Sequence, residues 1–315
     1  MEGNCLKFEN PVQDAISRIQ FAPHSNNLLI SSWDSTLRLY DVESCTMRLE
    51  ITSEAALLGC CFQNESTAFS IAADFRVTRH NFAVGTCQTV GYHHDLPTCV
   101  EYSQETGLAI SAGLDNRLCS WDLRVDHVEY SKNVGGEVEA MSIHGVFVVV
   151  AIGTSISIYD LRNLKEPVHL KEPSMDYGIR SVCSFPNGKG HAVSLQPMYF
   201  ANCLFRCHPK PKDGKYHLVA VNDIVFHPSI HGAFVTGDEE GYAIMWAAQS
   251  KKRLYQFQRY GNSVASLSYN CEGELLAVAS SYNYQEATES EQPPQVFIHR
   301  MNENDVGSSS IKSSK

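Results

Sequence analysis

The sequence of 315 residues predicts an all-β fold, a closed β-propeller of seven four-stranded blades. The first observation is a repeat of short segments that alternate apolar and polar residues, as half-buried strands do, and that carry an aromatic or histidine side chain near their end. Four of these ring residues are Tyr40, His80, Trp121 and Tyr159. They recur about every 40 residues, which is the length of a propeller blade.

The second observation is an acidic residue six positions before the ring. The pairs are Asp34 and Tyr40, Asp74 and His80, Asp115 and Trp121, and Glu240 and Trp246. A third observation is the order of elements. An apolar strand such as residues 27–32 precedes each acidic turn, and an alternating strand such as residues 16–21 precedes that. Strand, strand, turn, strand is the order of a blade.

The chain length sets the number of blades and the extent of the domain. At about 40–45 residues per blade the chain holds seven, which begin near residues 12, 52, 94, 136, 177, 219 and 262. We therefore expect one domain over residues 1–303. An open ring would expose strand edges, so we expect residues 1–11, and within them 6–9, to supply the outer strand of the last blade.

Two polar segments stand outside the repeat. Residues 284–295 are acidic and contain proline, which predicts an exposed hairpin loop in the last blade. Residues 304–315 have almost nothing to bury, which predicts a disordered tail.

Composition limits the environment and the class of partner. Hydrophobic residues make up 43% and charged residues 19%, and no apolar run reaches the roughly 18–20 residues of a membrane span. The amino-terminal residues lack a secretory signal, and eleven scattered cysteines fit a reducing nucleus or cytoplasm. A formal net charge of −10 argues against broad nucleic-acid binding. We expect a protein without membrane or direct nucleic-acid contacts.

The third repeat carries a family likeness. From His94 to Trp121 it resembles a WD40 repeat, a family in which His, Ser, Asp and Trp form a buried hydrogen-bonded set. The resemblance assigns that structural role to His94, Ser111, Asp115 and Trp121. A histidine and a carboxylate buried inside a sheet protein must satisfy each other's hydrogen bonds.

Four longer stretches resemble the WD40 proteins of the spindle-assembly checkpoint, and more distantly the mRNA export factors of the Rae type. They are SSWDSTLRLYDV (31–42), KKRLYQFQRY (251–260), SVASLSYN (263–270) and LAVASSYNYQE (276–286). The similarity covers nearly the whole chain and is weakest from about 191 to 217. It implies a non-enzymatic adaptor in the spindle checkpoint and chromosome alignment, a monomer within larger complexes. Its expected partners are checkpoint kinases and phosphorylated kinetochore scaffold motifs. Its expected locations are the nucleus, the cytoplasm and, in mitosis, the kinetochore or spindle.

Trp33 is an extra ring beside the repeat. Tyr40 and Asp41 occupy the aromatic-Asp position of the repeat, and Asp34 is the acidic turn residue. A tryptophan just before a tight turn reaches the rim of the propeller, where large rings anchor partners. The resemblance likewise implies that Trp33 contacts a partner motif. The alternative is that Trp33 covers a neighbouring blade, as most tryptophans are mainly buried.

A basic segment follows at residues 203–217, with four Lys or Arg residues and one acid. The resemblance implies a phosphothreonine site there with Arg206, His208 and Lys210 as candidates, while two prolines also suit a solvated loop. Nearby the sequence departs from the family. Met198 stands in the place of an arginine that pairs with partner glutamates, and methionine cannot make that bidentate contact. Either the usual kinase motif binds weakly or another surface is used.

Catalytic and metal-binding patterns are missing from the sequence. Cys203, Cys207 and His208 have no matching second Cys/His pair at zinc-site spacing. There is no Gly-x-Ser-x-Gly elbow and no glycine-rich phosphate loop. We expect no enzyme activity, no metal and no cofactor.

Arg124 and Arg162 end two aromatic-Asp-x-Arg patterns. These patterns recur in WD40 substrate receptors of cullin-RING ubiquitin ligases, so a ligase adaptor is an alternative partner for these arginines. They could equally be solvated surface residues. A Rae-type export adaptor is the other alternative function.

Overall fold

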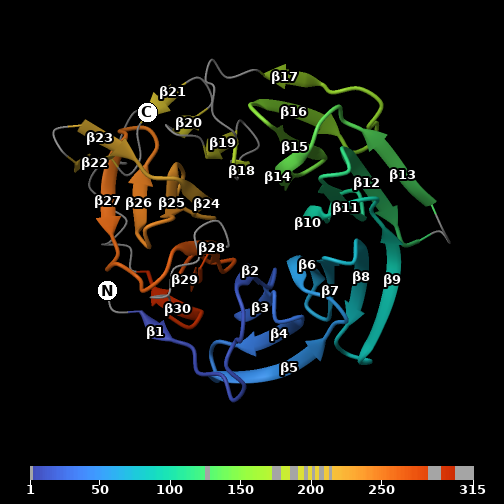
Figure 1. Ribbon diagram of the computed structural model, residues 1–315, viewed down its shortest axis with the longest axis horizontal. Helices are drawn as coiled ribbons and strands as arrows, with labels where there is room; N and C mark the ends of the chain where they lie inside the picture. Colours follow the sequence, from blue (N-terminus) through green and yellow to red (C-terminus); the bar gives the residue numbers. More distant parts are fainter. Residues whose placement is uncertain are drawn as a thin grey trace.

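The computed structural model describes residues 3–124, 128–171, 179–184, 191–194, 198–200, 203–205, 209–212, 215–282 and 292–301. Of residues 128, 129, 171 and those described between 191 and 218, only the backbone is described. The described chain consists of antiparallel sheets arranged around a central axis (Figure 1). Within it, no helix is long and apolar enough to cross a membrane.

Six of the sheets are regular four-stranded blades. The first is β2 (Ile16–Phe21), β3 (Asn27–Ser32), β4 (Thr36–Asp41) and β5 (Thr46–Thr52). The second is β6 (Leu57–Asn64), β7 (Thr67–Ala72), β8 (Arg76–Asn81) and β9 (Thr86–Tyr92). The third is β10 (Pro97–Ser103), β11 (Leu108–Gly113), β12 (Arg117–Asp122) and β13 (Val128–Asn133). The fourth is β14 (Val138–His144), β15 (Phe147–Ile152), β16 (Ser155–Asp160) and β17 (His169–Lys171).

The other two regular blades lie near the end of the chain. One is β24 (Val221–Phe226), β25 (Ala233–Asp238), β26 (Ala243–Ala247) and β27 (Lys252–Gln256). The last is β28 (Val264–Tyr269), β29 (Leu275–Ser280), β30 (Gln295–Arg300) and the amino-terminal β1 (Asn4–Cys5). The all-β propeller predicted from the sequence is confirmed.

The sequence predicts seven four-stranded blades, and the structure has six regular ones because the segment between the fourth blade and β24 departs from the pattern. There, a sheet of strands only three or four residues long is followed by a separate two-stranded hairpin. The sheet is β18 (Ser181–Ser184), β19 (His191–Ser194), β20 (Met198–Phe200) and β21 (Cys203–Phe205), and the hairpin is β22 (Pro209–Lys212) and β23 (Lys215–Leu218). Pro186 follows β18 and Pro197 precedes β20, so neither strand can be extended through a residue that lacks a backbone N–H. The structure thus has six regular blades and one rudimentary sheet.

The amino terminus joins the last blade to the first. Asn4 pairs with Ile298 and Cys5 with Phe297 in antiparallel register, and the Leu6 N–H donates to the Val296 carbonyl at 2.8 Å. The closing strand therefore precedes the segment 6–9 that the sequence indicated. Phe8 packs its ring on Tyr40 of β4 instead, with ring centroids 5.5 Å apart. The tail 304–315 and most of the loop 284–295 lie outside the described residues.

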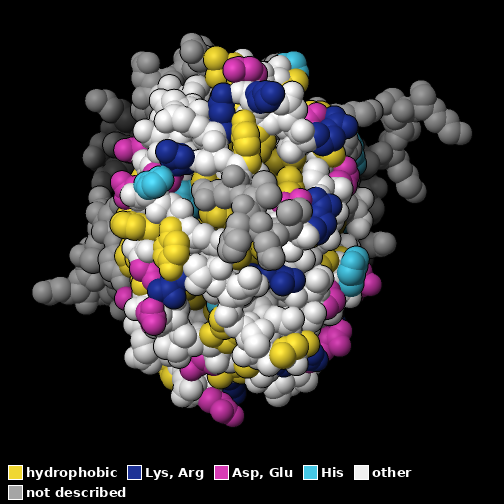
Figure 2. Space-filling view, turned by 90° about the vertical axis from the view of Figure 1, so that its right-hand side faces the viewer, with side chains coloured by type: hydrophobic (Ala, Val, Ile, Leu, Met, Phe, Trp, Pro, Cys, Tyr) yellow, Lys and Arg dark blue, Asp and Glu magenta, His cyan; other side chains and the backbone are white. Residues whose placement is uncertain are grey.

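Side-chain patterning explains why these strands form blades. The second strand of several blades is buried on both faces, as in β3, β7, β25 and β29, so it reads as a continuous run of apolar and small residues. The outermost strand is largely exposed, as in β9. Figure 2 views the ring from the side of β9 and β13 and shows acidic and basic side chains interspersed there, without a field of one sign.

Candidate partner-binding face

Trp33 lies in the turn between β3 and β4, at the end of the strands that forms one face of the ring. Its side chain and backbone together keep 38% of their surface exposed. Its N–H donates to the Ala15 carbonyl at 2.8 Å, which ties the turn to the segment that enters β2. A large ring held at the rim of a rigid scaffold is suited to docking an apolar side chain of another chain.

A buried ion-pair network holds the turn beneath Trp33. Arg38, which is almost fully buried, donates to Asp34 at 3.1 Å and to Glu50 at 3.0 Å. Asp34 also accepts from the Gln13 N–H at 3.0 Å. Burial opposes the charge of Asp34, but the hydrogen bonds from Thr36, Gln13 and Arg38 outweigh it and hold the pKa of Asp34 below the ordinary value. The turn that carries Trp33 is therefore preorganised.

The WD40 hydrogen-bonded set of the third blade is built on His93, and the assignment to His94 is wrong. His93 contacts Asp115 through Nδ1 at 2.9 Å and Ser111 through Nε2 at 2.7 Å, and the Trp121 indole N–H donates to Ser111 at 2.8 Å. His94 is exposed, and only its backbone N–H reaches Asp115, at 3.0 Å. Successive side chains of an extended chain point to opposite sides, so a slip of one residue reverses the assignment.

The same hydrogen bond recurs in two other blades. In the fifth regular blade along the chain, β24–β27, the Trp246 indole N–H donates to Thr236 Oγ1 at 2.8 Å. In the second blade, His80 Nε2 lies 2.7 Å from Ser70 Oγ and replaces the tryptophan. Burial lowers the pKa of His80 to about 4. A neutral imidazole therefore fills a tryptophan position inside this blade.

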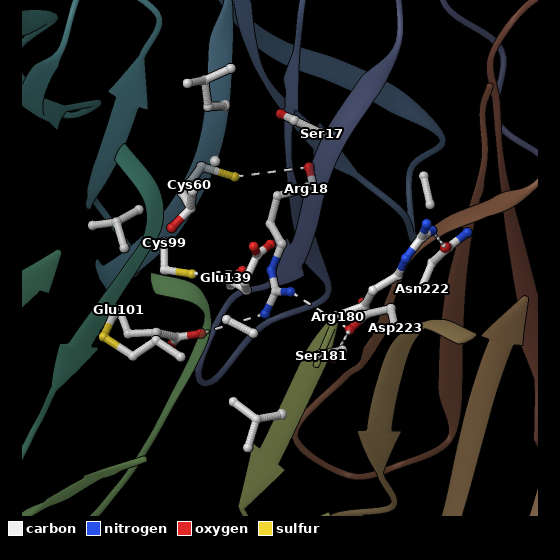
Figure 3. Close-up of a pocket in the computed structure, with 18 residues that line it drawn as sticks. Ser17, Arg18, Cys60, Cys99, Glu101, Glu139, Arg180, Ser181, Asn222 and Asp223 are labelled. Carbon is white, nitrogen blue, oxygen red and sulfur yellow. Dashed lines mark hydrogen bonds and ion pairs between the residues drawn. The ribbon is translucent and has the colours of Figure 1, made fainter. Parts of the chain in front are cut away.

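A cluster of ion pairs crosses the central channel (Figure 3). The sequence analysis did not predict this cluster. Arg18 of β2 reaches Glu101 of β10 at 3.4 Å and Asp223 of β24 at 3.7 Å. Asp223 also accepts from the Leu267 N–H at 2.8 Å. Three blades are thus connected through one guanidinium. A charged residue at an inward position of an apolar strand, as in ISRIQF and VNDIVF, was the available signal.

Cavities adjoin this cluster, and both include Arg18, Glu101 and Asp223 in their walls. One of about 170 Å³ is lined mainly by polar groups such as Glu139 and Asn222 (Figure 3). The other, about 320 Å³, includes apolar side chains among its walls. Burial raises the pKa of Glu101, and Asp223 adds to the rise while Arg18 opposes it. Burial also opposes the charge of Arg18, but the two carboxylates outweigh it and raise its pKa.

Replacing Arg18 with methionine is expected to lower the free energy of unfolding by about 2 kcal/mol, because two carboxylates then remain in the channel without their cation. The triple variant Arg18→Met, Glu101→Gln and Asp223→Asn should recover most of the loss, since it removes the charges together. Urea unfolding at pH 7 measures both. A single variant as stable as wild type, or a triple variant less stable than the single one, would refute the role of the cluster.

The side chains of the basic segment lie outside the described part of the structure. Arg206 and His208 lie outside the described residues, and so do the side chains of Lys210 and Met198. The backbone of Lys210 pairs with His217 in the hairpin β22–β23. The phosphothreonine site therefore stays a prediction.

Arg124 and Arg162 occupy equivalent exposed positions at the ends of β12 and β16. Each donates to the aspartate two positions earlier, Arg124 to Asp122 at 2.7 Å and Arg162 to Asp160 at 2.5 Å. Hydrogen bonds from the arginine side chains lower the pKa of each aspartate to about 2. Each guanidinium is thus engaged by a carboxylate of its own blade. Among the residues whose side chains are described, no group of His, Cys, Asp or Glu is placed to hold a metal ion.

Comparison with known proteins adds independent information. Residues 3–41 match the family described as WD domain, G-beta repeat. The chain is 46% identical to mitotic checkpoint protein BUB3.3 of Arabidopsis thaliana, over 96% of this chain and 100% of that protein. It is 37% identical to BUB3.1 of the same plant, over 95% and 94% of the two chains. It is 31% identical to mitotic checkpoint protein bub3 of Dictyostelium discoideum, over 92% and 93%.

Proposed function

The chain belongs to the BUB3 family of WD40 mitotic checkpoint proteins, and on that premise we propose that it binds short motifs of checkpoint kinases and kinetochore scaffold proteins through the face that carries Trp33. The function expected from the sequence, a non-enzymatic adaptor of the spindle-assembly checkpoint, is confirmed by this membership. The alternatives in mRNA export and ubiquitin ligation are not favoured by it. Relatives named for the checkpoint imply partners within checkpoint complexes and a role at the kinetochore or nucleus in mitosis.

The exposure of Trp33 is the observation that supports this binding face. A tryptophan in a tightly held turn, with 38% of its surface accessible, offers a large apolar area at little entropic cost, since its surroundings are already fixed. In this proposal Trp33 contacts an apolar side chain of the motif. Arg206, His208 and Lys210 bind an acidic or phosphorylated residue. The protein gathers at unattached kinetochores during mitosis.

We also infer that the sheet β18–β21 is the fifth of seven blades. It follows the fourth blade and precedes β24 in the chain, and it has the four antiparallel strands of a blade. The contacts of β18 with β14 on one side and β24 on the other support this position.

Replacing Trp33 with alanine is expected to weaken partner binding at least tenfold, as loss of a central aromatic anchor does. The measurement is affinity purification of a tagged copy from mitotic cells, with and without phosphatase treatment, followed by titration of the purified partner. Val84→Asn is the matched control, because Val84 is 71% exposed in the turn between β8 and β9, on the opposite face. If Trp33→Ala captures and binds every partner as wild type does, the anchor assignment is wrong.

A further inference from the structure

Phe75 occupies the corresponding turn of the second blade in an unfavourable backbone conformation. Its φ is +71°, in the left-handed region, and its N–H donates to the Ala72 carbonyl at 3.0 Å. The equivalent residues of the first and third blades are Ser35, with φ +64°, and Asn116, with φ +61°. Asparagine tolerates this region, whereas a bulky side chain is rarely seen there. The turn therefore requires a left-handed residue, but nothing in its backbone requires a phenylalanine.

Nor is the ring buried in the core. Phe75 is 38% exposed, as much as Trp33 of the neighbouring blade. Tyr92 at the end of β9 is 57% exposed and stands opposite Arg76, the residue after Phe75, in the β8–β9 register. Three exposed aromatic residues thus lie on one face over adjacent blades. Strain retained at an exposed apolar residue is characteristic of binding sites.

The charges around these rings are mainly acidic. Arg76 donates to both Glu54 and Asp74 at 2.6 Å, so two carboxylates share one guanidinium. The Glu54 side chain is 81% exposed, and its pKa is lowered by the hydrogen bond from Arg76, so it remains charged near neutral pH. Asp95, in the loop that enters β10 on the same face, is exposed as well. A partner segment here would meet an excess of negative charge.

We propose that Phe75, with Trp33 and Tyr92, forms an apolar docking strip for an extended peptide segment of a partner protein that carries large apolar side chains next to Lys or Arg. The strip is selective for basic neighbours because Glu54 and Asp95 flank it and complementary charge sets specificity. This inference rests on the proposed function, since it uses the face that carries Trp33. It differs from that proposal in the chemistry of the ligand, which is basic here and acidic or phosphorylated at the segment 206–210.

The probe is a library of random 16-residue peptides displayed on phage. The library is first depleted on the full-length Phe75→Asn protein and then selected on the full-length wild-type protein. The expected enriched sequences combine an aromatic or large aliphatic residue with Lys or Arg. Depletion on Val84→Asn is the matched control and should leave the same peptides in the library. Failure to enrich any peptide after depletion on Phe75→Asn, or enrichment of acidic sequences, would overturn the proposal.

A synthetic copy of the leading peptide is then titrated against purified variants. Phe75→Asn should bind at least tenfold more weakly than wild type, and Glu54→Lys about tenfold more weakly, while Val84→Asn is unchanged. The midpoint of urea unfolding of Phe75→Asn should be equal to or higher than that of wild type, because asparagine relieves the strain. A lower midpoint would make Phe75 a packing residue and contradict the inference.

The two proposals on this face fail separately. If Phe75→Asn keeps full affinity while Trp33→Ala loses the mitotic partners, the strip is wrong and the proposed function stands. If both variants lose the peptide but neither loses the mitotic partners, the strip binds basic segments, and the proposed use of Trp33 in checkpoint complexes is wrong.

Discussion

Replacement of His93 with alanine is expected to lower the free energy of unfolding by about 4 kcal/mol, whereas replacement of His94 costs less than about 0.5 kcal/mol. His93 is the partner of Asp115, a carboxylate whose side chain is only 2% exposed. Without the imidazole, this carboxylate and the Ser111 hydroxyl each lose a buried hydrogen-bond partner. Burying a charge without its partner is among the most destabilising changes a point substitution makes.

Urea unfolding at pH 7 measures both variants, and His94→Ala serves as the matched control because it changes the same side chain one position away. The double variant His93→Ala and Asp115→Ala should be no less stable than His93→Ala alone, since the unpaired charge is then removed. Equal losses at the two histidines would return the structural role to His94. A loss at His94 only would show that the side chain of His94, and not that of His93, is the buried partner of Asp115.

Acidification from pH 7 to pH 5 is expected to lower the free energy of unfolding by roughly 4 kcal/mol. Burial lowers the pKa of His80 and of His299 to about 4, and it lowers the pKa of His227 as well. The unfolded chain takes up these protons near pH 6.5, but in the fold His80 and His299 do so only near pH 4. Each such histidine therefore favours unfolding progressively as the pH falls from about 6.5 towards 4, by about 1.4 kcal/mol per pH unit.

Carboxylates change the free energy of unfolding little between pH 7 and pH 5. Asp34, Asp41, Asp122 and Asp160 have lowered pKa values in the fold, so their stabilising effect is lost only below the unfolded value of about 4. Glu101 has a raised pKa and acts in the opposite direction, because the folded state then binds its proton first. The histidines therefore dominate between pH 7 and pH 5.

Urea unfolding at pH 7, 6 and 5 tests this expectation. His80→Gln keeps a hydrogen-bond donor for Ser70 and has no titrating group, so its loss between pH 7 and pH 5 should be smaller by about 2 kcal/mol. A stability that is flat between pH 7 and pH 5, or a His80→Gln variant with the full wild-type dependence, would show that these histidines do not titrate as buried groups.

The sequence predicts the propeller because a blade is a local unit. Its acidic turn and its ring residue lie within one repeat, as Asp115 and Trp121 do, so their spacing can be read directly. The turn that carries Trp33 is equally local, and its exposure follows from its place before the turn. The short sheet β18–β21 was not predicted, since prolines beyond its strand ends limit the strands without changing the length of the repeat.

The sequence pattern could not predict which residues of distant blades meet, or which of two adjacent side chains faces inward. The choice between His93 and His94 depends on which of two adjacent side chains faces inward, and a period-two pattern cannot decide it when both are histidine. Arg18, Glu101 and Asp223 are brought together only by closure of the ring. The left-handed backbone of Phe75 follows from the turn, but its significance appears only when its exposure is known.

Mitotic arrest in cells depleted of the endogenous protein tests the role of the Trp33 face most directly. After treatment with a microtubule poison, the wild-type chain and Val84→Asn are expected to restore the arrest, whereas Trp33→Ala, expressed at the same level, is expected to fail. Restoration of the full arrest by Trp33→Ala would contradict the conclusion that this chain acts in the checkpoint through that face.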